Sequence, residues 1–169
     1  MRKLLLALAA VFALVLPALA VADVLDASDG TLVVRDGNGK IRINAVGGLI
    51  GRLDHGRVTL VDQLDGDGTP PIVNGCDTID RVIDLDSGGT MAICQGNKLR
   101  FRLVGGKFRV IVNGTGIDLS AVGHGTVTLN GRGDGLNIFD GRYSLNGEAF
   151  KSLPDDPQNL TLAAPGTTP

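Results

Sequence analysis

Aromatic side chains and glutamate are scarce in this chain. Its 169 residues include no tryptophan, one tyrosine and five phenylalanines. Polysaccharide-cleaving enzymes usually combine paired acids with aromatic platforms, so the scarcity of aromatic residues disfavours that class. Only one of the 18 acidic residues, Glu148, is a glutamate. Aspartate favours turns and helix caps whereas glutamate favours helix interiors, so the acid composition also argues against a helical protein.

Histidine is nearly absent, and the common catalytic motifs are missing. His55 and His124 are the only histidines, and neither belongs to an HxH or HExxH pattern. No GxSxG nucleophile elbow occurs. We therefore predict that each histidine is a turn residue beside its glycine. A metal site shared by the two histidines is the alternative, if the two halves of the chain pack symmetrically.

The chain has two cysteines, Cys76 and Cys94. A redox pair or a metal site would call for CxxC spacing or nearby histidines, which are lacking here. In an exported protein two such cysteines predict one disulfide. Closing a loop of this length stabilises a fold by about 3 kcal/mol in the chain-entropy model.

The N-terminal residues 1–22 have the pattern of an export signal. A basic start is followed by an apolar run over 4–16 and by small-residue cleavage sites ending at Ala20 or Ala22. An uncleaved membrane anchor is the alternative, because the run approaches the length of a span. We expect a periplasmic or secreted protein with no membrane span after cleavage. Without the signal, 14 basic and 18 acidic residues give a net charge of −4, which argues against general nucleic-acid binding.

The remaining composition is typical of an all-β protein. The chain has 25 glycines, and Val, Ile, Leu and Thr dominate the segments between Gly, Asp and Asn turn signals. We predict one domain over residues 23–153, an antiparallel β-sandwich or barrel, followed by a flexible tail over 154–169. A β-solenoid is the alternative fold.

Two segments of the chain are similar to each other. KIRINAVGG at 40–48 matches KLRFRLVGG at 98–106, and HGRVTL at 55–60 matches HGTVTL at 124–129. These matches predict two diverged β-hairpin repeats, over about 31–62 and 90–130. In the first copy we expect turns at 36–39, at Gly47-Gly48 and at His55-Gly56, with a bulge at Gly51.

Residues 98–113 predict a central hairpin that turns at Gly105-Gly106. Arg102 would lie opposite Arg109, an unfavourable pair unless an acid neutralises it. Either neighbouring aspartates such as Asp84, Asp86 or Asp118 do so, or the face binds an acidic polysaccharide or another envelope polyanion. Nucleic acid is not expected, because both phenylalanines of the hairpin point to the other face. The candidate ligand-binding residues are Lys98, Arg100, Arg102, Lys107 and Arg109.

An acidic loop follows the first copy. Asp62, Asp65 and Asp67 are weak candidates for calcium ligands, because carboxylate oxygens suit a hard cation. The loop lacks the spacing of an EF-hand, since the twelfth position counted from Asp65 is Cys76. We therefore favour an acidic surface loop and expect no bound metal or cofactor.

Three runs, at 116–123, 127–131 and 141–145, resemble segments of uncharacterised small secreted all-β proteins of bacteria. The resemblance implies export and an all-β fold, and it brings no activity or catalytic residue with it. We predict an exported, non-enzymatic β domain that acts as a binding or structural module. A small secreted carbohydrate-active hydrolase with a carboxylate-based site is the alternative. Exposed edge strands would allow self-assembly by strand addition, so the oligomeric state is open.

Overall fold

The computed structural model describes residues 28–63, 71–85, 88–133 and 139–166. The export signal, Asp65, Asp67 and Asp86 lie outside these ranges. Within them all regular structure is β, and no helix is long and apolar enough to cross a membrane. The strands are β1 (Gly30–Asp62), β2 (Ile72–Leu85), β3 (Gly89–Leu103), β4 (Lys107–Gly131), β5 (Arg142–Leu145), β6 (Lys151–Ser152) and β7 (Gln158–Leu162).

These strands form one open antiparallel sheet in the order β2-β3-β1-β4-β7, with β5 paired to β1 and to β6. The prediction of an all-β fold is confirmed. The sandwich and the barrel are not confirmed, because the described strands belong to a single open sheet.

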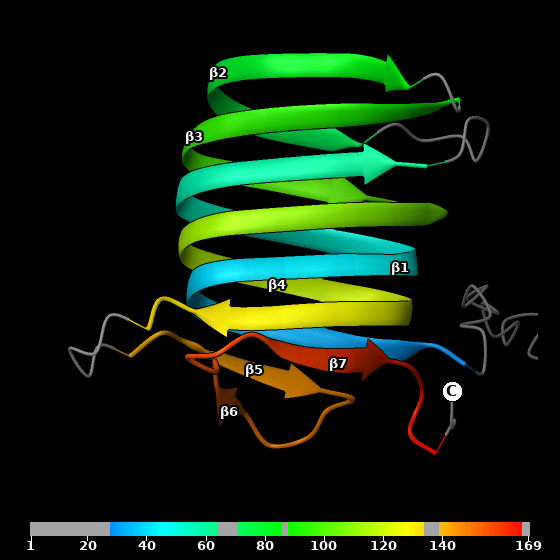
Figure 1. The fold of residues 1–169 in the computed structure, drawn as a ribbon, viewed down its shortest axis with the longest axis vertical. Helices are drawn as coiled ribbons and strands as arrows, with labels where there is room; N and C mark the ends of the chain where they lie inside the picture. Colours follow the sequence, from blue (N-terminus) through cyan, green and yellow to red (C-terminus); the bar gives the residue numbers. More distant parts are fainter. Residues whose placement is uncertain (1–27, 64–70, 86–87, 134–138, 167–169) are drawn as a thin grey trace, which may run out of the picture.

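The sheet winds on itself as a coil. Within β1, Ile41 pairs with Val112 on one edge and with Leu129 on the other. Both partners belong to β4 and are 17 residues apart. One strand can have the same partner on both edges only if the two wind round a common axis. Figure 1 shows the resulting stack of turns, with β2 at the top and β5, β6 and β7 at the bottom. A β-solenoid, the alternative fold, also winds round an axis. In this coil, however, the neighbouring strands β1 and β4 are antiparallel.

The predicted hairpins of the first copy are wrong. β1 runs without reversal from Gly30 to Asp62, through all three expected turns. Gly51 is not a bulge, because β1 pairs with β3 through this position without a change of register. A Cβ at Gly51 would lie 2.5 Å from the Phe101 ring, so this glycine leaves room for an aromatic side chain.

The predicted central hairpin is also wrong. Leu103, at the end of β3, pairs with Leu49, and Lys107, at the start of β4, pairs with Val46. The chain therefore keeps its direction along β1 through Gly105-Gly106, where both glycines have positive φ and form a bend. The two glycines bend the chain without reversing it, and the pairing partner on both sides of the bend is β1 rather than the adjacent segment. The twofold repeat remains a prediction.

Glycines mark the corners of the coil. One column runs across the sheet as Gly96, Gly56, Gly114, Gly39 and Gly131, each paired with the next. A second column includes Gly47, Gly123 and Gly30. At Gly47 φ is +140°, and a Cβ there would lie 2.1 Å from the carbonyl oxygen of Val122. The sheet can bend sharply at these columns because two backbones approach where a side chain would not fit.

Between the corners, alternate residues point into the coil. The in-and-out alternation of β1 and β4 in these segments places an apolar set inside and a mostly polar set outside. Inside are large side chains that are almost completely buried. They include Leu32, Ile41, Ile43, Leu53, Leu60, Leu99, Phe108, Ile117 and Leu129.

The two ends of the coil are held differently. At the upper end the disulfide Cys76–Cys94 joins β2 to β3, as predicted. Since disulfides persist in oxidising compartments, it indicates an exported environment. At the lower end β7 pairs with β4, and its Leu162 is fully buried. β7 lies within the segment 154–169 that the sequence predicted as a tail, where an isolated Leu-Thr-Leu run gives little strand signal.

Candidate functional site: an arginine-lined groove

The coil has two broad faces, separated by the glycine columns. One is the outer surface of residues 31–38, 48–55, 97–104 and 115–122, which we call the arginine face. The second face is the outer surface of 40–46, 57–62, 107–113 and 124–130. Alternation explains the exposure of the arginines: on β1, Arg52 points out because Leu53 beside it points in.

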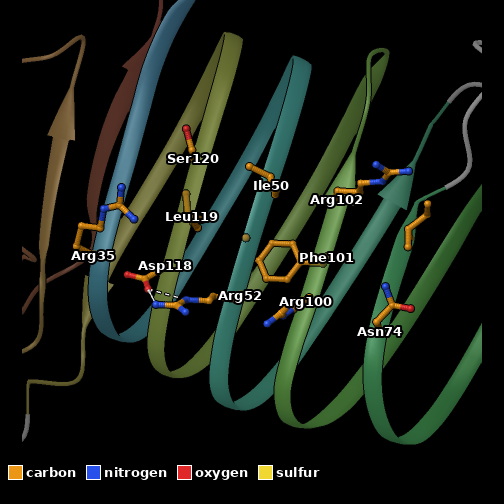
Figure 2. Close-up of a pocket in the computed structure, with 12 residues that line it drawn as sticks. Arg35, Ile50, Arg52, Asn74, Arg100, Phe101, Arg102, Asp118, Leu119 and Ser120 are labelled. Carbon is orange, nitrogen blue, oxygen red and sulfur yellow. Dashed lines mark hydrogen bonds and ion pairs between the residues drawn. The ribbon is translucent and has the colours of Figure 1, made fainter.

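Arginines on the arginine face form a row across successive strands. Arg100 on β3 pairs with Arg52 on β1, and Arg52 pairs on its other edge with Asp118 on β4. Arg35, on the lower turn of β1, comes next. Figure 2 shows Arg100, Arg52, Asp118 and Arg35 side by side in this order, with Asn74 of β2 beyond Arg100. The row therefore runs along the axis of the coil, perpendicular to the strands.

The row lies in an open groove of about 760 Å³. Among the described residues, four arginines and one aspartate line it, and these side chains carry a net charge of +3. The Phe101 ring and Leu119 form an apolar floor, and the ring is only 2% exposed. The charged lining residues are Arg35, Arg52, Arg100, Arg102 and Asp118.

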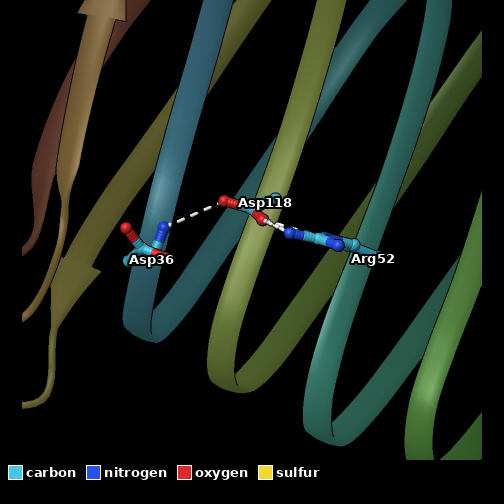
Figure 3. A network of polar contacts seen from close by, with 3 residues as sticks. All are labelled: Asp36, Arg52 and Asp118. Carbon is cyan, nitrogen blue, oxygen red and sulfur yellow. Dashed lines mark hydrogen bonds and ion pairs between the residues drawn. The ribbon is translucent and has the colours of Figure 1, made fainter.

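Asp118 fixes the position of Arg52. Its Oδ2 accepts hydrogen bonds from Nε and from one terminal nitrogen of Arg52, at 2.9 and 2.6 Å. Its Oδ1 accepts a bond of 3.0 Å from the backbone N–H of Asp36 (Figure 3). Burial by itself raises the pKa of Asp118, but the Asp36 N–H and the Arg52 guanidinium outweigh it and hold the pKa below its ordinary value. The Arg52 side chain remains 65% exposed, against 12% for Asp118.

Replacing this carboxylate should change the dependence of stability on pH. Because the pKa of Asp118 is lowered by folding, its carboxylate stabilises the fold at neutral pH. The stabilisation is lost as the pH falls through the folded pKa. We expect Asp118→Asn to lower the free energy of unfolding at pH 7 by about 1–2 kcal/mol. The difference from wild type should shrink below about pH 4.

Urea unfolding at a series of pH values measures this effect. Asp156→Asn, which changes an exposed aspartate, is the control and should leave the wild-type profile unchanged. A constant difference between Asp118→Asn and wild type across the acid range would contradict the assigned ion pair.

The structure divides the predicted basic stripe between the two faces. Lys98, Arg100 and Arg102 belong to the arginine face, whereas Lys107 and Arg109 follow the bend and belong to the second face. Arg102 does not oppose Arg109. It pairs with Ile50 and Ile72, and Arg109 pairs with Asn44 and Val61. The coil therefore separates Arg102 from Arg109, but it places Arg100 opposite Arg52 instead.

The second face has a smaller hollow of about 350 Å³. Arg42 and Arg109 are its charged lining residues, and Asn44, Thr126 and Thr128 supply neutral polar groups. It offers half as many arginines as the groove of the arginine face.

The histidines and the predicted calcium ligands do not form a site in the described part of the chain. His55 lies beside one glycine column, where its Nδ1 is 2.8 Å from Asn97 Oδ1. His124 lies beside the other column, with Nδ1 2.9 Å from Asp29 Oδ1. Both occupy strands, so the prediction of turn residues is wrong. Asp62 is 8% exposed, and no cluster of three metal-ligating side chains occurs among the described residues.

Sequence reasoning missed Arg35 and Arg52 as members of the site. The signal was present: the two arginines are 17 residues apart, the same interval that separates the two β4 partners of Ile41. Glycines at 30, 39, 47 and 56 mark half of that interval. A search for a 17-residue period would have placed both arginines on one face.

Comparison with known proteins adds no relative. The chain matches no protein-family model, no curated protein and no solved structure.

Proposed function

We propose that the protein is an exported, non-enzymatic binding module, periplasmic or extracellular, that binds an acidic polysaccharide in the arginine-lined groove. The observation that carries the proposal is an imbalance of charge. Asp118 is the only acid among the described residues that line the groove, and it is bound to Arg52. Arg100 and Arg102 have no salt bridge with any residue in the described ranges. An anionic ligand would supply the missing partner.

The acid content of the groove supports a binding role over hydrolysis. Glycoside hydrolysis usually employs two carboxyl groups on either side of the scissile bond. The described lining of the groove contains one, and a carboxylate held by arginine with a lowered pKa is a poor proton donor.

Nucleic acid fits the groove less well than a polysaccharide. Binding of single strands relies on bases stacked on aromatic side chains. Phe101, the one aromatic residue in the described lining of the groove, is buried beneath the surface. Ile50 and Ile72 provide apolar surface at the rim without a stacking plane.

The proposal is tested with two charge-matched triple variants. Arg35→Ser/Arg100→Ser/Arg102→Ser removes three charges from the arginine face. Arg42→Ser/Lys107→Ser/Arg109→Ser removes three from the second face. We expect the first variant to lose at least about tenfold in affinity for polygalacturonate at low ionic strength, and the second to lose less than about twofold. Wild-type binding should weaken as salt is added.

Binding is measured by calorimetry, with neutral dextran as the ligand control. Circular dichroism and urea unfolding establish that both variants retain the fold. Equal losses in the two variants, or a loss confined to the second-face variant, would refute the groove as the binding surface. An absence of polygalacturonate binding by the wild-type protein would refute the proposed function.

A further inference from the structure

We infer that the polysaccharide lies along the axis of the coil, across the strands, and reaches beyond the groove to Arg142 on β5. The inference rests on the proposed function and adds the direction and the length of the bound chain. It follows from the positions of the arginines rather than from their number.

The arginine row continues past the groove. Arg35 pairs with Arg142 of β5, on the edge of β1 that faces away from Asp118. Residues opposite each other in an antiparallel pair point to the same side. Both arginines are exposed, and the Arg142 guanidinium lies 5.1 Å from the centre of the Phe150 ring. Four strand steps separate Arg100 from Arg142, a span of about 19 Å at the usual strand spacing.

A second line of charge competes with this row. Lys98, Arg100 and Arg102 alternate along β3, so a polymer could also lie parallel to that strand. The groove favours the axial direction, because its lining extends from Asn74 on β2 to Arg35 on the lower turn of β1 and does not include Lys98. The two lines cross at Arg100. Arg142 lies at the end of the axial row, and Lys98 lies at the end of the line along β3.

Asp118 does not block the axial path. Its carboxylate is largely covered, while the Arg52 side chain bound to it remains mostly exposed. A ligand above the row therefore meets the guanidinium before the carboxylate. The row presents positive charge at Arg100, Arg52, Arg35 and Arg142 in turn.

Two single variants distinguish the directions. Arg142→Ser and Lys98→Ser each remove one exposed charge outside the groove. We expect Arg142→Ser to weaken polygalacturonate binding about two- to fivefold and Lys98→Ser to leave it unchanged. Arg142→Lys keeps the charge and should restore most of the affinity.

The length of the ligand provides an independent measurement. With size-fractionated oligogalacturonates, affinity should rise with chain length until the ligand spans the row, and then level off. Arg142→Ser should bind the shortest oligomers as wild type does, because they do not reach β5. Calorimetry supplies the affinity and the number of protein molecules bound per chain.

The outcomes test the direction, the length and the chemical class of the bound ligand separately. A loss in Lys98→Ser with none in Arg142→Ser would overturn the axial direction and place the chain along β3. Affinity for galacturonate monosaccharide equal to that for the polymer would overturn the extended ligand. In both cases polyanion binding in the groove would stand. Tighter binding of single-stranded oligodeoxythymidylate than of polygalacturonate would overturn the polysaccharide as the ligand.

Discussion

Gly47→Ala is expected to lower the free energy of unfolding by about 3 kcal/mol or more, because two costs add at this position. The backbone has a φ of +140°, a conformation that side-chain-bearing residues rarely adopt. The new Cβ would also lie 2.1 Å from the carbonyl oxygen of Val122 on the paired strand. The nearest obstacle is backbone, so no side-chain rotation relieves it.

The adjacent residue is a matched control. Gly48 has no positive φ, and its nearest neighbour to an added Cβ is the Leu103 carbonyl oxygen at 3.7 Å, an ordinary contact. Gly48→Ala should change stability by less than about 1 kcal/mol. Urea unfolding followed by circular dichroism compares the two. Similar losses in both variants would mean that the corner does not depend on the close approach of β1 and β4.

Phe108→Ala is expected to cost about 3–5 kcal/mol. The side chain is 1% exposed and belongs to the apolar cluster inside the coil. Because β1 and β4 both line the interior of the coil, a cavity there removes contacts from β1 as well as from β4. Domains of this size have a total stability of about 5–15 kcal/mol, so the loss is a large fraction of it.

Phe139→Ala is the control, because it makes the same substitution at an exposed position. Phe139 is 58% exposed, and its truncation should stay within about 0.5 kcal/mol of wild type. Thermal and urea unfolding measure both variants. A small loss in Phe108→Ala would show that the interior of the coil repacks around the missing ring.

The in-and-out pattern of the strands was predictable from the sequence, but their pairing was not. The alternation in Lys98–Leu103 correctly put Leu99, Phe101 and Leu103 on a buried face. A period-two alternation predicts which residues share a face, but it does not predict which strand is the pairing partner. Glycine pairs flanked by apolar residues predict hairpins in most β proteins. Here Gly47 instead forms a corner of the coil, where it pairs with Gly123, a glycine that is distant in the sequence.

The candidate site was partly predictable for the same reason. Arg100 and Arg102 were identified from a local charge pattern, and the structure places both in the groove. Arg35 and Arg52 come from other turns of the coil, so no local pattern connects them to Arg100. Asp118 was considered as a partner for the arginines, and it binds Arg52 rather than a residue of the predicted hairpin.

The double pairing of β1 has a kinetic consequence. Among the described residues, strands that follow each other in sequence pair at the turn between Leu85 and Gly89, where β2 meets β3, and again between β5 and β6. From β2–β3 through β1–β3 to β1–β4, the paired residues become more distant in the chain, as in Thr31 and Val122, and the β1–β5 pair Arg35 and Arg142 is more distant still. Because loop closure precedes the gain from non-local pairing, such topologies fold slowly, in milliseconds to seconds. We expect winding to proceed downward from the Leu85–Gly89 turn, so that the lower end of the arginine row is completed last.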